Sequence, residues 1–168
     1  MTGIRTVSSA WQSAYYLLIL FAVAGLAVYD AKTRRVSDKA LVFFSTVALA
    51  SPVLVALDYN SGVFGWGFMI GPLLSALIGA ATGFIILLAA AVASKGGNGV
   101  GGGDIKLAAV LGFVYGAFGI ISILLIASLL ALPAGLIRKK RSGGQSLSLP
   151  FVPFMTMGCL AITIARFI

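Results

Sequence analysis

Carboxylates are the main reactive side chains in this chain, which has four acidic residues, one cysteine and no histidine. Without histidine, the sequence excludes a serine–histidine–aspartate triad and a histidine-based metal site. The single cysteine, Cys159, excludes an intrachain disulfide, and its apolar sequence context favours a packing role. Chemistry must therefore come from carboxylates, lysines, hydroxyl groups and the backbone, and we expect no metal and no cofactor.

The four acidic residues lie in two kinds of sequence environment. Asp58 lies in a turn-rich segment and Asp38 lies among lysines and arginines, so a solvated turn residue and a helix cap are expected. Asp30 and Asp104 instead lie where a polar segment meets a long apolar run. An ionisable residue at membrane depth is a functional candidate. The structural alternatives are an interfacial anchor for Asp30 and a helix N-cap for Asp104.

Glycines precede Asp104 in the pattern GxGD, within a segment that holds six glycines between residues 94 and 106. Gly101 and Gly103 allow the backbone to approach a substrate strand closely, and they leave its N–H and C=O groups free to pair with an extended peptide. Lys106 follows two residues later. It is interpreted either as a residue that orients Asp104 or contacts an acidic substrate residue, or as a lysine that reaches to the membrane interface.

Two neighbouring carboxyl groups would supply the chemistry of peptide hydrolysis. They cannot both ionise readily, so they share one proton. The ionised group activates water and the protonated group donates to the oxyanion or the leaving amine. Asp30 lies at the carboxyl end of its expected helix, which disfavours a carboxylate, whereas Asp104 lies at a helix start, which favours one. This predicts that Asp30 holds the shared proton and that Asp104 activates water.

The composition indicates that these residues are positioned by membrane helices. Hydrophobic residues make up 60% of the chain and charged residues only 10%, whereas a soluble domain carries about 25% charged residues. In lipid the backbone must satisfy its own hydrogen bonds, and the apolar runs lack the two-residue alternation of a barrel strand. We therefore predict an all-α integral membrane protein, a bundle of about six transmembrane helices forming a single domain over residues 1–168.

The six spans are assigned from five apolar runs. A single helix over Leu107–Ile137 would be about 46 Å long, beyond a hydrocarbon core of about 30 Å. This run is therefore expected to form two spans, broken at Gly112, Gly116 or Gly119. The other runs are expected to span once each, the first as a retained helix without a signal cleavage site and the second with a possible kink at Pro52: Ala14–Tyr29, Ala40–Leu57, Phe68–Ala93 and Leu149–Phe167.

Ten of the twelve lysines and arginines that give the net charge of +8 lie in three segments between the apolar runs. Residues 31–39, 94–106 and 138–148 carry four, two and four lysines and arginines, whereas the alternate segments carry none. The positive-inside rule places the three basic segments in the cytoplasm and both termini outside. Asp30 and Asp104 then lie on the cytoplasmic side of a cytoplasmic (inner) membrane. Basic residues in this arrangement orient a membrane protein, so no nucleic-acid partner is expected.

The chain resembles the prepilin peptidases, the type IV prepilin leader peptidases among the GxGD aspartyl proteases. The first motif of that family is an aspartate at the end of a span followed by a basic stretch, and Asp30 followed by AKTRR matches it. Ser37 and Asp38 stand where the family usually has proline and asparagine. The second motif, GxGD-x-Lys, matches residues 101–106. A Pro-aromatic-x-Pro element opens the last run at residues 150–153.

This resemblance implies an aspartic endopeptidase that acts on prepilin or pseudopilin precursors. It implies cleavage between a short basic leader and an apolar helix, and membrane lipid is expected as a further partner. The absence of paired C-x-x-C motifs resembles the short form that lacks a methyltransferase segment. The residues that the resemblance assigns are Asp30 and Asp104 as the catalytic pair, with Gly101, Gly103, Lys106, Pro150 and Pro153 binding substrate or shaping the site.

A transporter or channel subunit with interfacial acids is the alternative function. A transporter is expected to place acidic residues near the midplane of the membrane and often contains repeats. The sequence shows no internal repeat, and its two candidate acids lie at the ends of apolar runs. The peptidase is therefore the preferred prediction, and the oligomeric state is left open.

Overall fold

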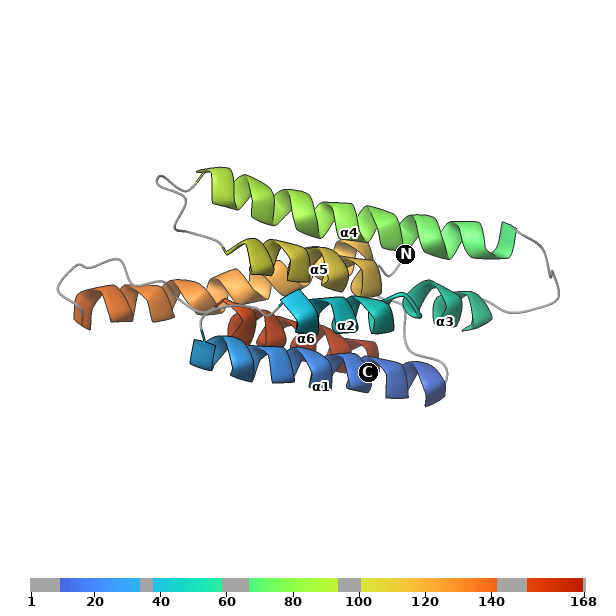
Figure 1. Ribbon diagram of the computed structural model, residues 1–168, viewed down its shortest axis with the longest axis horizontal. Coiled ribbons are helices and arrows are strands. Elements are labelled where there is room, and N and C mark those ends of the chain that lie inside the picture. Colours follow the sequence, from blue (N-terminus) through green and yellow to red (C-terminus); the bar gives the residue numbers. More distant parts are fainter. Residues whose placement is uncertain (1–9, 34–37, 59–66, 94–100, 142–150, 168) are drawn as a thin grey trace.

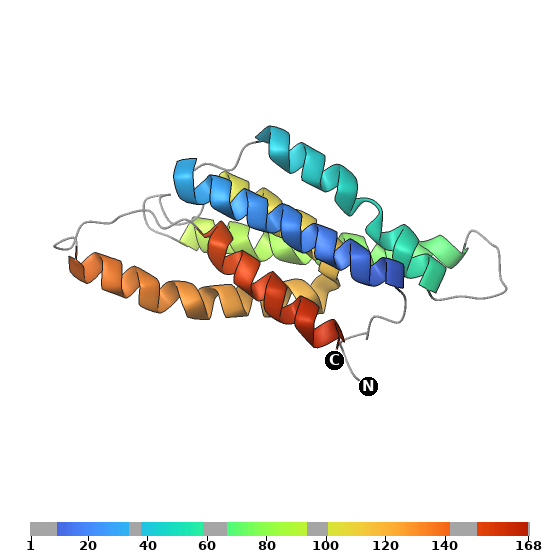
Figure 2. The same ribbon diagram turned by 90° about the horizontal axis from the view of Figure 1, so that it is seen from below.

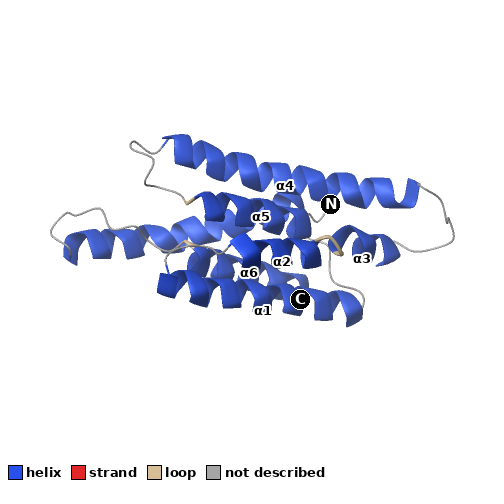
Figure 3. Ribbon diagram, in the orientation of Figure 1, coloured by secondary structure: helices blue, strands red, loops and turns tan. Residues whose placement is uncertain are grey.

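The computed structural model describes residues 10–33, 38–58, 67–93, 101–141 and 151–167, and these residues are almost entirely helical. The helices lie along one another in an elongated bundle (Figures 1 and 3). No strand occurs in the described part of the chain, so the predicted all-α fold is confirmed. The helices are α1 (Ala10–Thr33), α2 (Asp38–Ala48), α3 (Ser51–Asp58), α4 (Gly67–Ala93), α5 (Gly102–Arg141) and α6 (Val152–Phe167).

Three of these helices contain stretches long and apolar enough to cross a membrane: Gln12–Ala31, Ile70–Ala93 and Gly102–Ile137. Shorter apolar helical stretches cover Ala40–Ala56 and Val152–Arg166. Large apolar side chains cover the outside of the bundle, which in water would be unfavourable and in lipid is expected. The chain is therefore an integral membrane protein by the composition and exposure of its helices.

Helix α5 is two helical segments joined at Gly116. This glycine has φ 75° and ψ 176°, a backbone conformation that a residue with a Cβ rarely adopts. The chain turns back at this point, so the second segment (residues 117–141) returns towards the end of the bundle where α5 begins (Figures 1 and 2). The predicted division of this apolar run is confirmed, and the break falls at the middle one of the three candidate glycines.

Small residues allow α4 and the first segment of α5 (residues 102–115) to cross with their backbones in contact. A Cβ at Gly79 would overlap the carbonyl oxygen of Gly112, and a Cβ at Gly112 would overlap the carbonyl oxygen of Gly79. One turn away, a Cβ at Gly83 would lie 2.9 Å from the carbonyl carbon of Ala108. Pairs of small residues four apart on both helices are typical of closely packed membrane helices.

The second apolar run is divided into α2 and α3 by a turn at Leu49 and Ala50. Pro52 lies in the first turn of α3, where a missing N–H leaves no helical hydrogen bond unmade. The predicted irregularity at Pro52 is therefore confirmed as a full break just before it. Ser51 donates a hydrogen bond of 3.2 Å to the carbonyl oxygen of Phe113, which ties this break to α5.

A buried polar cluster stabilises the break at Gly116. Because the helix stops there, the carbonyl oxygen of Tyr115 is free to accept, and Arg166 of α6 donates to it at 2.9 Å. The guanidinium carbon of Arg166 lies 4.8 Å and 5.3 Å from the ring centroids of Tyr16 and Tyr115. The Tyr115 hydroxyl also pairs with Thr163 Oγ1 at 2.9 Å. The cluster fixes α1, α5 and α6 together at one end of the bundle.

Candidate active site

Asp104 is the third residue of α5 and accepts a hydrogen bond from the backbone just before the helix. Its Oδ2 accepts from the N–H of Gly101 at 3.3 Å, while its own N–H donates to the carbonyl oxygen of Gly101 at 3.0 Å. This is one half of a capping box, with Gly101 in the N-cap position, because glycine has no side chain to accept from the N–H of Asp104. Asp104 is therefore not itself the N-cap. Its carboxylate lies beside the free N–H groups of the first turn, which favour negative charge.

The three glycines before Asp104 differ in their burial and in the room they leave for a larger side chain. A Cβ at Gly101 would lie 3.2 Å from Asp104 Oδ2, so a larger residue would crowd the carboxyl against its hydrogen-bond donor. Gly102 is exposed, and a Cβ there would meet nothing within 4 Å. Gly103 is half-buried in the first turn of α5. The predicted role of Gly101 in shaping the site thus has a local geometric basis.

Asp30 lies in the last turn of α1 and is almost fully buried, with 5% of its surface exposed. Its carboxyl accepts a hydrogen bond from the backbone N–H of Val152, the first residue of α6. Its Oδ2 is buried without any hydrogen-bond partner in the described structure. An unpaired buried carboxyl oxygen is unfavourable for folding alone, so it is typical of a site that serves a reaction.

The structure brings these two acids together although they are 74 residues apart in the sequence. Their carboxyl groups are close enough to interact electrostatically. The end of α1 and the starts of α5 and α6 lie at the same end of the bundle in both views (Figures 1 and 2). Two carboxyl groups that interact in this way influence each other's ionisation, which is the coupling expected of a hydrolytic pair.

The surroundings of Asp30 contradict the argument that it holds the shared proton because it lies at the carboxyl end of a helix. Helix α1 continues past Asp30 to Thr33, and the N–H of Val152 brings the positive end of α6 to this carboxyl. The carboxyl groups of Asp30 and Asp104 therefore both lie beside helix N-termini, those of α6 and α5 respectively. Helix ends do not distinguish the protonated partner from the ionised one.

The remaining predicted site residues are spread around this end of the bundle. Lys106 is exposed on α5, and Pro153 is half-buried as the second residue of α6. Pro150 lies outside the described residues. Asp38 is the first residue of α2, one position after the N-cap place expected for it, and Asp58 is the last residue of α3.

Sequence reasoning missed Val152, which lies between the two prolines of the Pro-Phe-Val-Pro element. The prolines marked the start of α6, but a backbone donor leaves no trace in side-chain type. Cys159 is fully buried in α6, as expected of a packing residue. In the described ranges no three acidic, cysteine or histidine side chains gather in a way that could hold a metal ion.

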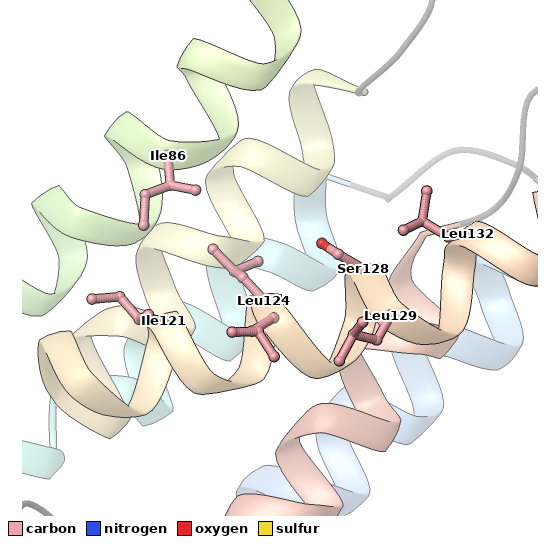
Figure 4. Close-up of a pocket in the computed structure, with 7 residues that line it drawn as sticks. Ile86, Ile121, Leu124, Ser128, Leu129 and Leu132 are labelled. Carbon is pink, nitrogen blue, oxygen red and sulfur yellow. The ribbon is translucent and has the colours of Figure 1, made fainter.

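An apolar groove of about 380 Å³ lies between α4 and the second segment of α5 (Figure 4). Its only polar side chain is that of Ser128, and it contains no titratable group. The groove therefore cannot supply acid–base chemistry by itself. Its lining residues are Ile86, Ile121, Leu124, Leu125, Ser128, Leu129 and Leu132.

Comparison with known proteins identifies the family of this chain. Residues 15–136 match the model of the type IV leader peptidase family, a range that includes both Asp30 and Asp104 and stops before α6. The chain is also 37% identical over 91 residues to the prepilin leader peptidase/N-methyltransferase of Bacillus subtilis (strain 168). That match covers 54% of this chain and 31% of the relative. No solved structure matches the chain significantly. Because the family model covers most of the sequence, this chain belongs to the type IV leader peptidase family.

Proposed function

We propose that this protein is a membrane-embedded aspartyl endopeptidase that removes the short basic leader from prepilin or pseudopilin precursors at the cytoplasmic face of the membrane. The observation that carries this proposal is that Asp30 and Asp104 come together where α1 ends and α5 begins, near enough for their carboxyl groups to interact electrostatically. Membership of the type IV leader peptidase family supports the same reaction class. The name of the Bacillus subtilis relative adds support for a prepilin substrate.

The proposed mechanism uses one proton shared between the two carboxyl groups. The ionised carboxyl removes a proton from water as the water oxygen attacks the scissile carbonyl carbon. The other carboxyl donates its proton to the developing oxyanion. As the tetrahedral intermediate collapses, the first carboxyl passes the proton it took from water to the leaving amine, and the proton on the oxyanion returns to the second carboxyl. Gly101 keeps Asp104 in a fixed orientation through the two hydrogen bonds between them. Gly103, Lys106 and Pro153 are proposed to shape the path of the substrate backbone.

The activity is tested by incubating the purified protein in detergent with a prepilin that carries a basic leader followed by an apolar helix. We expect a shortened product whose new N-terminus lies at the junction of leader and helix. Mass spectrometry of that product identifies the bond that is cleaved. A prepilin that stays intact across several pilin types, with a folded enzyme, would contradict the proposed function.

The proposed membrane topology gives an independent prediction. In a Cys159→Ser background, single cysteines placed in residues 32–39, 94–103 or 138–144 are expected to be shielded from an impermeant thiol reagent in intact cells. Cysteines placed in residues 58–67 are expected to react, because that segment lies outside under the positive-inside rule. Labelling of residues 138–144 from outside would show that the two segments of α5 do not both cross the membrane.

A further inference from the structure

The first turn of α6 presents one backbone N–H that the helix itself does not use. The N–H groups of Phe154 and Met155 both donate to the carbonyl oxygen of Phe151, at 3.1 Å and 3.2 Å. Pro153 has no N–H to donate. This leaves Val152 as the free donor among residues 152–155, and its N–H donates to the carboxyl of Asp30. Asp30 is therefore held by α6 and not only by its own helix.

The two partners of this contact are shielded from water. Val152 is fully buried and Asp30 is 5% exposed. In such surroundings a hydrogen bond to a carboxylate is stronger than at a surface, because solvent does not compete for either partner. The other oxygen of Asp30, Oδ2, has no hydrogen-bond partner among the described residues. One oxygen is thus held by the protein and the other is left available.

We propose that Val152 is a positioning residue, whose backbone N–H fixes the Asp30 carboxyl so that its unpaired oxygen faces the reaction. This inference rests on the proposed function and deepens it. It also gives Pro153 a physical purpose: proline at the second position removes the neighbouring N–H, so a single donor determines how Asp30 is oriented. Among the described residues, the charged group that interacts with Asp30 is Asp104 of α5.

Removing the N–H of Val152 tests the proposal directly. Val152→Pro deletes the donor at the first helical position, where proline is well tolerated, and Val152→Ala measures the loss of the side chain with the N–H kept. We expect kcat for prepilin cleavage in the proline variant to fall by about 10- to 100-fold relative to the alanine variant, with KM little changed. The acidic limb of the pH–activity profile is expected to move to higher pH, because the carboxylate loses a donor.

Backbone esters keep the test decisive if the proline variant does not fold. Replacing the Val152 amide with an ester removes only its N–H, and an ester at Phe154 removes a donor from the same turn without affecting Asp30. We expect the ester at Val152 to lower kcat by an amount in the range given for the proline variant, and the ester at Phe154 to lower it less than threefold. Equal effects of the two esters would overturn the proposal.

Infrared spectra separate this inference from the proposed function. The carboxyl bands of Asp30, assigned by subtraction of spectra from Asp30→Asn, are expected to shift in the Val152 ester and to stay fixed in the Phe154 ester. If no prepilin is cleaved but the band shifts, the hydrogen bond stands and the proposed function fails. If cleavage occurs and the Asp30 band does not respond to the Val152 ester, the positioning role is overturned.

Discussion

Replacing either Asp30 or Asp104 with asparagine is expected to lower prepilin cleavage by at least about 10³-fold while leaving the protein folded and inserted in the membrane. Asparagine keeps the size and polarity of the side chain but cannot exchange the proton that the pair shares. The carboxyl that remains also loses the neighbour that controls its protonation. Gel assays of leader removal over time, with equal amounts of detergent-purified protein, measure the effect.

Two substitutions outside the pair serve as controls. Asp58→Asn changes an acid at the end of α3, and Cys159→Ser makes a conservative change in the buried part of α6. Both are expected to keep activity within about threefold, because neither group takes part in the proposed reaction. Near-normal processing by Asp30→Asn or by Asp104→Asn would remove that residue from the catalytic pair.

Gly79→Val is expected to destabilise the protein by about 3 kcal/mol or more, which is the largest effect on folding that we predict. The new Cβ would overlap the carbonyl oxygen of Gly112, and backbone atoms cannot move aside as a flexible side chain can. Separating α4 from α5 to relieve the overlap would also disturb the helix that carries Asp104. Thermal unfolding in detergent, followed by tryptophan fluorescence or light scattering, measures the loss.

Gly71→Val is the matched control, because it makes the same change on the same helix. A Cβ at Gly71 would meet nothing within 4 Å. We expect its unfolding temperature to stay within a few degrees of that of the unchanged protein. Equal stability of the two variants would show that α4 and α5 do not cross at Gly79.

The sequence predicted the helices well because lipid restricts what an apolar run can form. Length alone required the run Leu107–Ile137 to divide, and the break lies at Gly116, a residue that adopts positive φ without strain. The positions of Asp30 and Asp104 at the ends of apolar runs were also predicted correctly. Their proximity followed from the family resemblance and not from any local pattern around each residue.

Backbone contacts between distant segments could not be predicted. The N–H of Val152 becomes a donor to Asp30 only when α6 packs against α1, and the pattern Pro-Phe-Val-Pro does not reveal its partner. The approach of Gly79 to Gly112 is of the same kind, because glycines four apart occur on many helices and only tertiary packing selects a pair. Arg166 likewise donates to the carbonyl oxygen of Tyr115, which lacks a partner within its own helix only because the helix breaks at Gly116.

The contact between Asp30 and Val152 can form only late in the synthesis of the chain. Val152 follows Asp30 by 122 residues, so a ribosome adding about 5–20 residues per second makes the two on the order of ten seconds apart. Asp104 is made 74 residues after Asp30, so both carboxylates are present without the donor that orients Asp30 only while the last 48 residues of that interval are made. Under the proposed function, the carboxyl of Asp30 is therefore oriented for the reaction only after α6, the last described helix, has packed against α1.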